Sequence, residues 1–420
     1  MTKYNPVERK IAGFLNRYPA IKRETKRVYQ RVNYRIFGED EFTHEMNSDT
    51  ELFAVSEWFG SPSQKRKQFF GYFDTTPWSD AMKAGLYHEY SGSDTVDLVE
   101  YRDGTRRVVG SSSAWNFQQG SRAQWHPTQN NCILYNDIES DRTFAKQTTT
   151  TGEIVETFSQ PIQAVNPTGG DYLSLNYRRL DRHRPDYGYG TDDGTLLQPP
   201  EADGLRLVDF ETKEEKLVIS LRSLIDATDR TAIEDKHYVN HALFDPTGDK
   251  FVFMHRWQDE SGRISRLYLS DRAGNREILL DDDIVSHYCW LNKNQLFVWG
   301  RSEQFGDGYH IINVDTGSLK YVDTLDDWGD GHPSVSPDGH YVVTDTYPDR
   351  ARKRHLLLYN RRADTVTKLG QFFEPLEYTG TSRCDLHPRW SPDGTAISID
   401  SAHDGTRRSY IIDVTNIVDC

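Results

Sequence analysis

The sequence is poor in cysteine and has no long apolar run. Its 420 residues include four cysteines, Cys132, Cys289, Cys384 and Cys420, at spacings that form no disulfide framework. No stretch approaches the roughly 18 consecutive apolar residues that a membrane helix needs. The first 22 residues, MTKYNPVERKIAGFLNRYPAIK, lack the apolar core of a signal peptide. These absences favour free thiols in a reducing compartment, and we expect the protein to be cytoplasmic.

The motifs of several common enzyme classes are also missing. The chain has no Gly-x-Ser-x-Gly elbow, no Walker A phosphate loop and no dinucleotide fingerprint after a strand. With 50 Lys and Arg against 64 Asp and Glu, the formal net charge is −14, which argues against nucleic acid as a partner. The 12% of aromatic residues, together with 30 glycines and 17 prolines, are typical of strands joined by turns.

The first 40 residues differ in charge from the rest of the chain. They hold ten Lys and Arg against four Asp and Glu, so this segment is near +6 whereas the remainder is near −20. Apolar residues at helical spacing predict a basic helical extension over residues 1–48. These residues are Ile11, Phe14, Leu15 and Tyr18 before Pro19, and Val28, Val32 and Ile36 after it. The extension is either a cap on the acidic body or a docking element for an anionic membrane surface or a partner.

An internal repeat determines the predicted architecture. HPRWSPDGTAISID at 387–400 and HPSVSPDGHYVVTD at 332–345 both place a histidine five residues before the proline of a Ser-Pro-Asp-Gly turn. The other copies, three clear and two weak, begin at His241, His287 and His126, and at Tyr72 and Ile162. Each unit alternates apolar and polar residues between turns. Seven such units predict an all-β, seven-bladed β-propeller over residues 49–420, with a two-sheet sandwich as the alternative.

Propeller geometry predicts where the repeated histidines lie. The first strand of each blade lines the central channel, so residues at the starts of these strands form a ring at one mouth. The predicted ring consists of His126, His241, His287, His332 and His387. Second strands return to the same face, which adds Asn136, Asp137, His255, Arg256, Arg301, Asp345 and His403. The alternative is that the histidines cap blade starts by hydrogen bonding to the backbone.

A metal site is predicted where two blades meet. In RCDLHPRW, Cys384 precedes His387 by three residues, His403 follows on the return strand, and His332 belongs to the neighbouring blade. A thiolate with imidazoles in a tetrahedron suits zinc, so His332, Cys384, His387 and His403 are predicted to hold a structural zinc ion. The alternative is a buried cysteine among ordinary polar contacts.

Six stretches carry a resemblance to a known family. They are FFGYFDTTPW (69–78), AWNFQQGSRAQWHP (114–127), RPDYGYG (184–190), FVFMHRW (251–257), HPSVSPDGHYVVTDTYP (332–348) and CDLHPRWSPDG (384–394). Through them the chain resembles the seven-bladed propeller polysaccharide lyases, which include oligogalacturonate lyases and ulvan lyases. The resemblance implies β-elimination on a uronic-acid polymer and an acidic polysaccharide or oligosaccharide as partner. Similar proteins in polysaccharide assembly suggest the alternative, a non-catalytic glycan-binding propeller.

The resemblance also implies roles for individual residues. By position, His126 and Tyr189 serve proton transfer and Arg206 faces the uronate carboxylate, with Tyr189 and Arg206 in a long insertion between blades three and four. The residues implied to bind substrate are His241, His255, Arg256 and Arg301. The chain departs from the ulvan lyases because residues 132–146 lack their second active-site histidine and offer Asn136 and Asp137 instead. That departure bears on catalysis and not on the fold.

Overall fold

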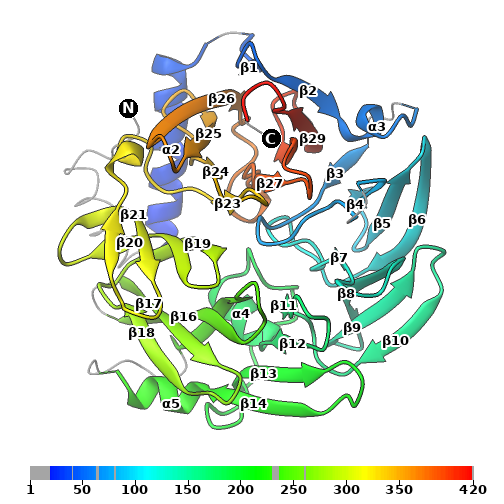
Figure 1. Cartoon of the computed structure of the whole chain (residues 1–420), viewed down its shortest axis with the longest axis vertical. Coiled ribbons are helices and arrows are strands. Elements are labelled where there is room, and N and C mark those ends of the chain that lie inside the picture. Colours follow the sequence, from blue (N-terminus) through cyan, green and yellow to red (C-terminus); the bar gives the residue numbers. More distant parts are fainter. Residues whose placement is uncertain are drawn as a thin grey trace.

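Seven antiparallel sheets surround a central axis in the computed structural model, which describes residues 19–39, 41–62, 66–79, 82–228, 236–259 and 262–418 (Figure 1). The predicted seven-bladed β-propeller is therefore confirmed. Blades are numbered here in chain order, and each blade begins with its innermost strand. Within the described residues, no helix is long and apolar enough to cross a membrane.

The first three blades occupy residues 67–220. Blade 1 consists of β3 (Lys67–Phe69), β4 (Ala84–Tyr90), β5 (Val96–Arg102) and β6 (Thr105–Ser112). Blade 2 consists of β7 (Gln124–Trp125), β8 (Cys132–Glu139), β9 (Arg142–Thr149) and β10 (Ile154–Phe158). Blade 3 consists of β11 (Ala164–Val165), β12 (Asp171–Ser174), β13 (Gly204–Asp209) and β14 (Glu215–Ser220). Two helices accompany blade 3, α4 (Tyr177–His183) inside the long insertion and α5 (Leu221–Asp226) after β14.

The other four blades follow the same plan. Blade 4 consists of β15 (Tyr238–Phe244), β16 (Lys250–Asp259), β17 (Gly262–Asp271) and β18 (Arg276–Leu280). Blade 5 consists of β19 (Val285–Asn292), β20 (Gln295–Ser302), β21 (Gly306–Asn313) and β22 (Leu319–Tyr321), followed by the short helix η2 (Asp323–Leu325). Blade 6 has β23 (Ser334–Val335), β24 (Tyr341–Asp345), β25 (Lys353–Asn360) and β26 (Thr365–Phe373). Blade 7 has β27 (Arg389–Trp390), β28 (Ala396–Ser401) and β29 (Arg408–Asp413), preceded by η3 (Gly380–Ser382).

The repeated Ser-Pro-Asp-Gly sequence builds the turn between the first two strands of a blade. In blade 7, Ser391 donates its backbone N–H to the Ala396 carbonyl (2.8 Å) and accepts the Ala396 N–H on its side chain (2.9 Å). Asp393 accepts the Thr395 N–H at 3.0 Å. Gly394 has φ +75°, a left-handed conformation that a residue with a Cβ adopts only at a cost. The turn therefore accounts for Ser, Asp and Gly, but not for the histidine.

Strands from the N-terminal segment close the propeller. β2 (Glu51–Ala54) pairs antiparallel with β29 and completes blade 7, so this blade contains both ends of the propeller chain. β1 (His44–Met46) lies within the predicted extension and pairs with β26 as a fifth strand of blade 6. A short helix, α3 (Val55–Trp58), leads from β2 toward blade 1. Apolar side chains of the last blade and the first then pack against one another.

The apolar core is divided into layers between neighbouring blades. Side chains of blades 6 and 7 form one cluster, and those of blades 4 and 5 form another. Further layers fill each remaining interface, including the seam where Val55, Tyr87 and Ile411 meet between blades 7 and 1. Because successive residues of a strand point to opposite sides, each blade can contribute to two layers. The alternating pattern of the repeats follows from this arrangement.

The helix α2 (Pro19–Phe37) precedes the closing strands and lies beside blades 5 and 6 (Figure 1). Tyr34 stacks on Phe373 with ring centroids 5.5 Å apart, and Lys353 pairs with Glu39 at 2.7 Å. The predicted helical stripe is present at Val28, Val32 and Ile36. The predicted apolar positions Ile11, Phe14, Leu15 and Tyr18 lie outside the described residues.

The closure seam predicts a large stability difference between two isoleucines. Ile411 is fully buried on β29, whereas Ile154 on β10 is 57% exposed. We expect Ile411→Ala to lower the free energy of unfolding by about 2–5 kcal/mol, because it removes buried methyl groups and leaves a cavity at the seam. Ile154→Ala is the matched control and should change the urea midpoint little. Equal midpoints for the two variants would contradict the closure described above.

Candidate functional site

Four of the five predicted ring histidines lie together at one mouth of the channel. His241 and His287 lie in β15 and β19, and His332 and His387 each lie two residues before the first strand of their blade. The ring centroids of His287 and His332 are 4.1 Å apart, and those of His332 and His387 are 4.3 Å apart. All four side chains are at most 5% exposed. The repeat thus places imidazoles from four consecutive blades in one buried cluster.

Two aromatic residues from the segment after β3 fill the space between these histidines. Tyr72 stacks on His241 with centroids 5.0 Å apart, and its hydroxyl lies 3.3 Å from the His241 Nε2. The ring of Phe73 packs against those of His332 and His287, with centroid distances of 5.4 and 5.9 Å. The weak repeat that begins at Tyr72 therefore reaches the ring, but through a chain segment that crosses the channel mouth.

The long insertion lies inside blade 3, between β12 and β13, and not between blades 3 and 4 as the sequence predicted, and it reaches the same mouth. Tyr187 packs edge-on against His241 with centroids 5.0 Å apart. Asp186 pairs with Arg184 (3.0 Å) and with Arg383 of the segment before blade 7 (2.6 Å). This ion-pair cluster fastens the insertion to the far side of the channel, and it brings Tyr187 into the site.

His126 does not belong to the ring, and the prediction that it does is wrong. It follows β7 and donates its backbone N–H to the Cys132 carbonyl (2.9 Å), as Ser391 does to Ala396 in blade 7. Its Nδ1 accepts the N–H groups of Thr128 (3.3 Å) and Gln129 (3.1 Å). His126 is therefore a turn residue at the opposite end of the strand, because His-Pro of blade 2 corresponds to Ser-Pro of blades 6 and 7.

Arg122 takes the place that His126 was predicted to fill. It precedes Trp125 by three residues, as His387 precedes Trp390, and the two residues share a left-handed backbone, with φ +57° and +44°. Arg122 is buried and binds Asp74 through two nitrogens, at 2.9 and 3.1 Å. Aligning the repeats on the tryptophan instead of the proline identifies this residue from the sequence.

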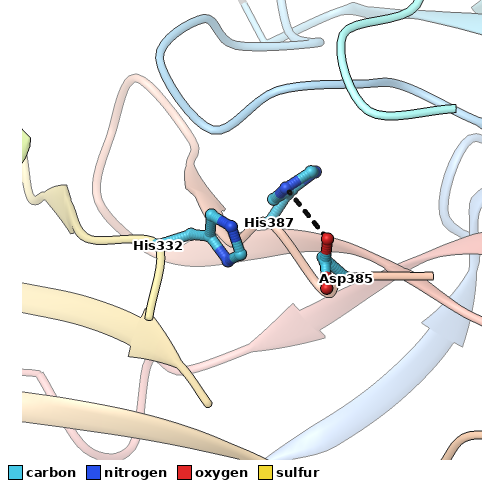
Figure 2. Close-up of side chains that lie close together, drawn as sticks. All are labelled: His332, Asp385 and His387. Carbon is cyan, nitrogen blue, oxygen red and sulfur yellow. Dashed lines mark ion pairs between the residues drawn. The ribbon is translucent and has the colours of Figure 1, made fainter. Parts of the chain in front are cut away.

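His332, Asp385 and His387 form a candidate metal centre (Figure 2). Their ligand atoms lie within 4.8 Å of one another, and the His387 Nε2 is 3.9 Å from the Asp385 carboxylate. The Nδ1 of His332 faces the Asp345 carboxylate at 2.8 Å, and the Nδ1 of His387 donates to the Gly71 carbonyl at 2.8 Å. Both Nε2 atoms are buried without a hydrogen-bond partner among the described residues. Histidine ligands of metals are held in this way, with the second nitrogen donating to a carboxylate or carbonyl.

Two buried carboxylates fix this centre in place. Asp345 accepts the backbone N–H of His332 (2.8 Å) on one oxygen and those of Leu386 (3.0 Å) and His387 (3.2 Å) on the other. Burial opposes its ionisation, but the facing His332 and nearby Arg354 hold the pKa of Asp345 below its usual value. Burial likewise opposes ionisation of Asp385, and Arg354 (2.7 Å) and Arg383 (2.6 Å) hold its pKa well below the ordinary range. Both residues are therefore anionic at neutral pH.

The other two predicted metal ligands lie apart from this centre. Cys384 is buried, burial raises the pKa of its thiol to about 12, and its backbone N–H donates to Glu374 at 3.1 Å. The ring of His403 packs between blades 6 and 7, and its centroid lies 4.6 Å from those of Tyr410 and His44. Successive residues of an extended segment point to opposite sides, so Asp385 faces His387 and Cys384 does not. The four predicted ligands are thus not brought together, and Asp385 replaces the cysteine.

Tyr189 and Arg206 are not brought together either. Tyr189 stacks on Tyr177 with centroids 4.4 Å apart and accepts a hydrogen bond from Asn136 at 3.0 Å. Burial raises the pKa of Tyr189 to about 12. Arg206 lies on β13, the third strand of blade 3, and donates to the Ala202 carbonyl at 2.8 Å. A third strand is two strand spacings, about 10 Å, from the channel, which explains why Arg206 does not reach the ring.

An arginine-rich cleft of about 780 Å³ opens beside the ring. It lies between α2, blades 4 and 5, and the segment around Gly380, and its lining includes Arg27, Lys236, Arg256, Trp257, Arg263 and Asp330. The Arg184 guanidinium, with burial and Arg256, lowers the pKa of Arg263 to about 10. Asp330 joins the cleft to the ring, since it accepts from the His287 Nδ1 at 2.9 Å. A surplus of positive charge at this place favours an anionic ligand.

The remaining predicted binding residues divide between this cleft and other places. Arg256 lines the cleft and donates to the Val285 carbonyl at 2.9 Å. His255, its neighbour on β16, points to the other side of the strand, where its Nε2 lies 2.9 Å from the His237 Nδ1. Arg301 pairs with Asp307 at 2.6 Å and does not line the cleft. Without the strand register, no sequence signal distinguishes Arg256 from its neighbours as the residue that faces the cleft.

The contacts of Asp345 predict a severe effect of Asp345→Asn. The amide cannot accept from the three backbone N–H groups and the His332 ring at once, so buried donors lose their partner. We expect the free energy of unfolding to fall by about 3–5 kcal/mol, the range for a broken buried charge network. Asp97→Asn, at an exposed position of β5, is the control and should leave the chemical-denaturation midpoint unchanged. A wild-type midpoint for Asp345→Asn would contradict the bridging role.

Comparisons with known proteins bear on the fold. No protein-family model and no curated protein matches the chain. An oligogalacturonate lyase structure from Vibrio parahaemolyticus is similar over 89% of this chain and 98% of its own, with a TM-score of 0.59 and 13% identity. An oligogalacturonate lyase in complex with manganese covers 89% of this chain and 96% of its own, with a TM-score of 0.63 and 13% identity. At such identities the similarity shows a shared seven-bladed propeller fold and is only a distant hint of lyase activity.

Proposed function

We propose that the chain cleaves uronic-acid-containing glycans by β-elimination, at a divalent metal ion held by His332, Asp385 and His387. One observation carries the proposal: a buried His-Asp-His cluster with two unpartnered Nε2 atoms lies beside an arginine-rich cleft. The cleft supplies positive charge for the carboxylates of an acidic glycan, and the cluster supplies a place for a cation. The resemblance of the sequence and the lyases of similar fold support the same reaction class.

The donor set suits a first-row divalent metal ion. Imidazole nitrogens are ligands of zinc and iron, and a carboxylate oxygen suits manganese as well. The Cys384 thiol lies outside the cluster, so the cluster has no sulfur ligand that would favour zinc over manganese. Three protein ligands leave coordination positions open, as in catalytic sites. A bound ion would draw charge from a uronate carboxylate and so acidify the proton on the adjacent carbon.

Elimination also needs a base and an acid near the uronate. Burial, with Arg256 nearby, lowers the pKa of His241 well below its usual value, so the imidazole is neutral and its Nδ1 has no partner among the described residues. His241 can accept the C5 proton as the double bond forms. Burial raises the pKa of Tyr72 well above 10, so its hydroxyl stays protonated. Tyr72 or Tyr187, both in contact with His241, can donate a proton to the leaving 4-linked oxygen.

One observation favours the second candidate function, glycan binding without cleavage. Tyr72, Phe73 and Tyr187 cover the ring so closely that its histidines are at most 5% exposed. A sugar reaches His241 only if these aromatic residues move. A propeller that binds acidic glycans in the outer cleft, as in polysaccharide assembly, does not require that movement.

The decisive experiment is incubation of the metal-loaded protein with a panel of uronic-acid polymers. The unsaturated uronate at a new chain end absorbs in the ultraviolet, so product formation can be followed directly. We expect one polymer class to yield this product and a chelator to stop the reaction. If calorimetry detects glycan binding while no polymer yields the product, the binding function replaces the lyase function.

Metal retention should separate the observed cluster from the ligand set predicted by sequence. We expect about one divalent ion per chain by elemental analysis of protein purified without chelators, because both Nε2 atoms are held ready for a ligand. His387→Ala should lose the ion. Cys384→Ser and His403→Ala should keep it, since neither side chain joins the cluster. Loss of the ion in Cys384→Ser with retention in His387→Ala would contradict the centre proposed here.

Arg263 should contribute measurably to the binding of acidic oligosaccharides. It lines the cleft, and the nearby Arg184 and Arg256 disfavour its positive charge. A bound anion would stabilise that charge. We expect Arg263→Ala to weaken oligouronate binding about ten- to hundred-fold, the range for a hydrogen bond to a charged group. Arg107→Ala, at an exposed position of β6, is the matched control. Equal affinities in calorimetry for the two variants would exclude the cleft as the glycan site.

A further inference from the structure

The helix α2 presents its apolar side to solvent. Val28, Val32 and Ile36 follow one another at intervals of four residues and are 59%, 49% and 65% exposed. We refer to these three residues as the apolar stripe. A helix on the surface of a globular protein normally turns such a stripe toward the core. The apolar stripe of α2 therefore has no role in holding the helix to the propeller.

Polar and aromatic contacts hold the opposite side of α2 in place. Arg27 and Gln30 line the cleft, and Asn33 and Tyr34 are half-buried. Tyr34 stacks on Phe373, and beyond the helix Lys353 pairs with Glu39. About two turns of the helix, over residues 27–34, thus use this side toward the body. The orientation of α2 is set by these contacts, and within the part of the chain that the structure describes the apolar stripe stays exposed.

Positive charge surrounds the apolar stripe. Over residues 19–37 the sequence contains six Lys and Arg and one acidic residue, Glu24, although the whole chain has a net charge of −14. Arg31 and Arg35 are exposed and lie on the same helix as the stripe. Apolar residues flanked by cations are typical of helices that lie in a membrane interface. Three side chains are also far fewer than the roughly 20–30 residues per side of a stable protein interface.

We propose that α2 docks on an anionic membrane surface, with the apolar stripe entering the interface and Arg31 and Arg35 contacting lipid phosphates. The combination of cations and apolar residues favours an anionic membrane over a protein partner. A neutral apolar partner would not need the cations, and an acidic protein partner would not need the apolar stripe. Since Arg27 and Gln30 on the other side of α2 line the cleft, docking places the cleft next to the membrane surface. This inference does not depend on whether the cleft belongs to a lyase.

Co-sedimentation of the full chain with vesicles tests the proposal. We expect binding to vesicles of phosphatidylcholine with added phosphatidylserine, weaker binding at high salt, and none to phosphatidylcholine alone. Arg31→Gln with Arg35→Gln should reduce the partition coefficient about five-fold for each cation removed. Val28→Ser with Val32→Ser and Ile36→Ser should reduce it at least about ten-fold, because the apolar area no longer leaves water.

The matched control removes three apolar residues of comparable exposure far from α2. Val108→Ser with Ile154→Ser and Val155→Ser changes the outer strands of blades 1 and 2, at positions 45%, 57% and 50% exposed, and should bind vesicles as the wild type does. Equal melting temperatures show that the stripe variant is folded. Absence of binding to anionic vesicles overturns the proposal. So does sedimentation-velocity evidence of a dimer that the stripe variant loses, which would make the stripe a contact between two copies.

Discussion

The buried carboxylate of Asp345 is the interaction on which the site depends. It ends the second strand of blade 6 and accepts hydrogen bonds from His332 of its own blade and from the backbone of Leu386 and His387 of blade 7. One anion therefore sets the orientation of the His332 ring and the path of the segment that carries Asp385 and His387. A buried anion is costly unless every partner is present, so this geometry tolerates little change.

Local charge at the channel mouth is opposite to the charge of the chain as a whole. The net charge is −14, yet the cleft is lined by Arg27, Arg256 and Arg263. Burial keeps His241 and His387 neutral, and neighbouring arginines oppose their protonation further. The two buried aspartates remain ionised because arginines or a histidine face them. Neutral imidazoles beside anionic carboxylates are the protonation states in which such groups bind a cation.

The fold was predictable from the sequence, whereas the site was predictable only in part. Strand alternation and the Ser-Pro-Asp-Gly turns are local signals, so seven repeats were sufficient for seven blades. Which histidine belongs to the ring depends on register, and His-Pro occurs both before a first strand, at His387, and in a turn, at His126. A shift of one residue exchanges the two sides of an extended segment, which is why Asp385 and not Cys384 joins the cluster. In the insertion, no local pattern distinguishes Tyr187 from Tyr189. The position of Tyr187 follows from the ion pair of Asp186 with Arg383, and that of Tyr189 from its contacts with Tyr177 and Asn136.

The position of the candidate metal centre relative to the closure links folding to function. His332 belongs to blade 6, and Asp385 and His387 precede blade 7, the two blades that β1 and β2 complete. A blade that lacks its outer strand exposes an unpaired edge and loses part of its interlayer core. Pairing of residues 44–54 with β26 and β29 therefore stabilises the two blades that carry the candidate ligands. The segment that leads into these strands, α2, also forms a wall of the cleft. Closure of the propeller and completion of the cleft thus use the same N-terminal segment, which also supports the two blades that carry the candidate metal centre.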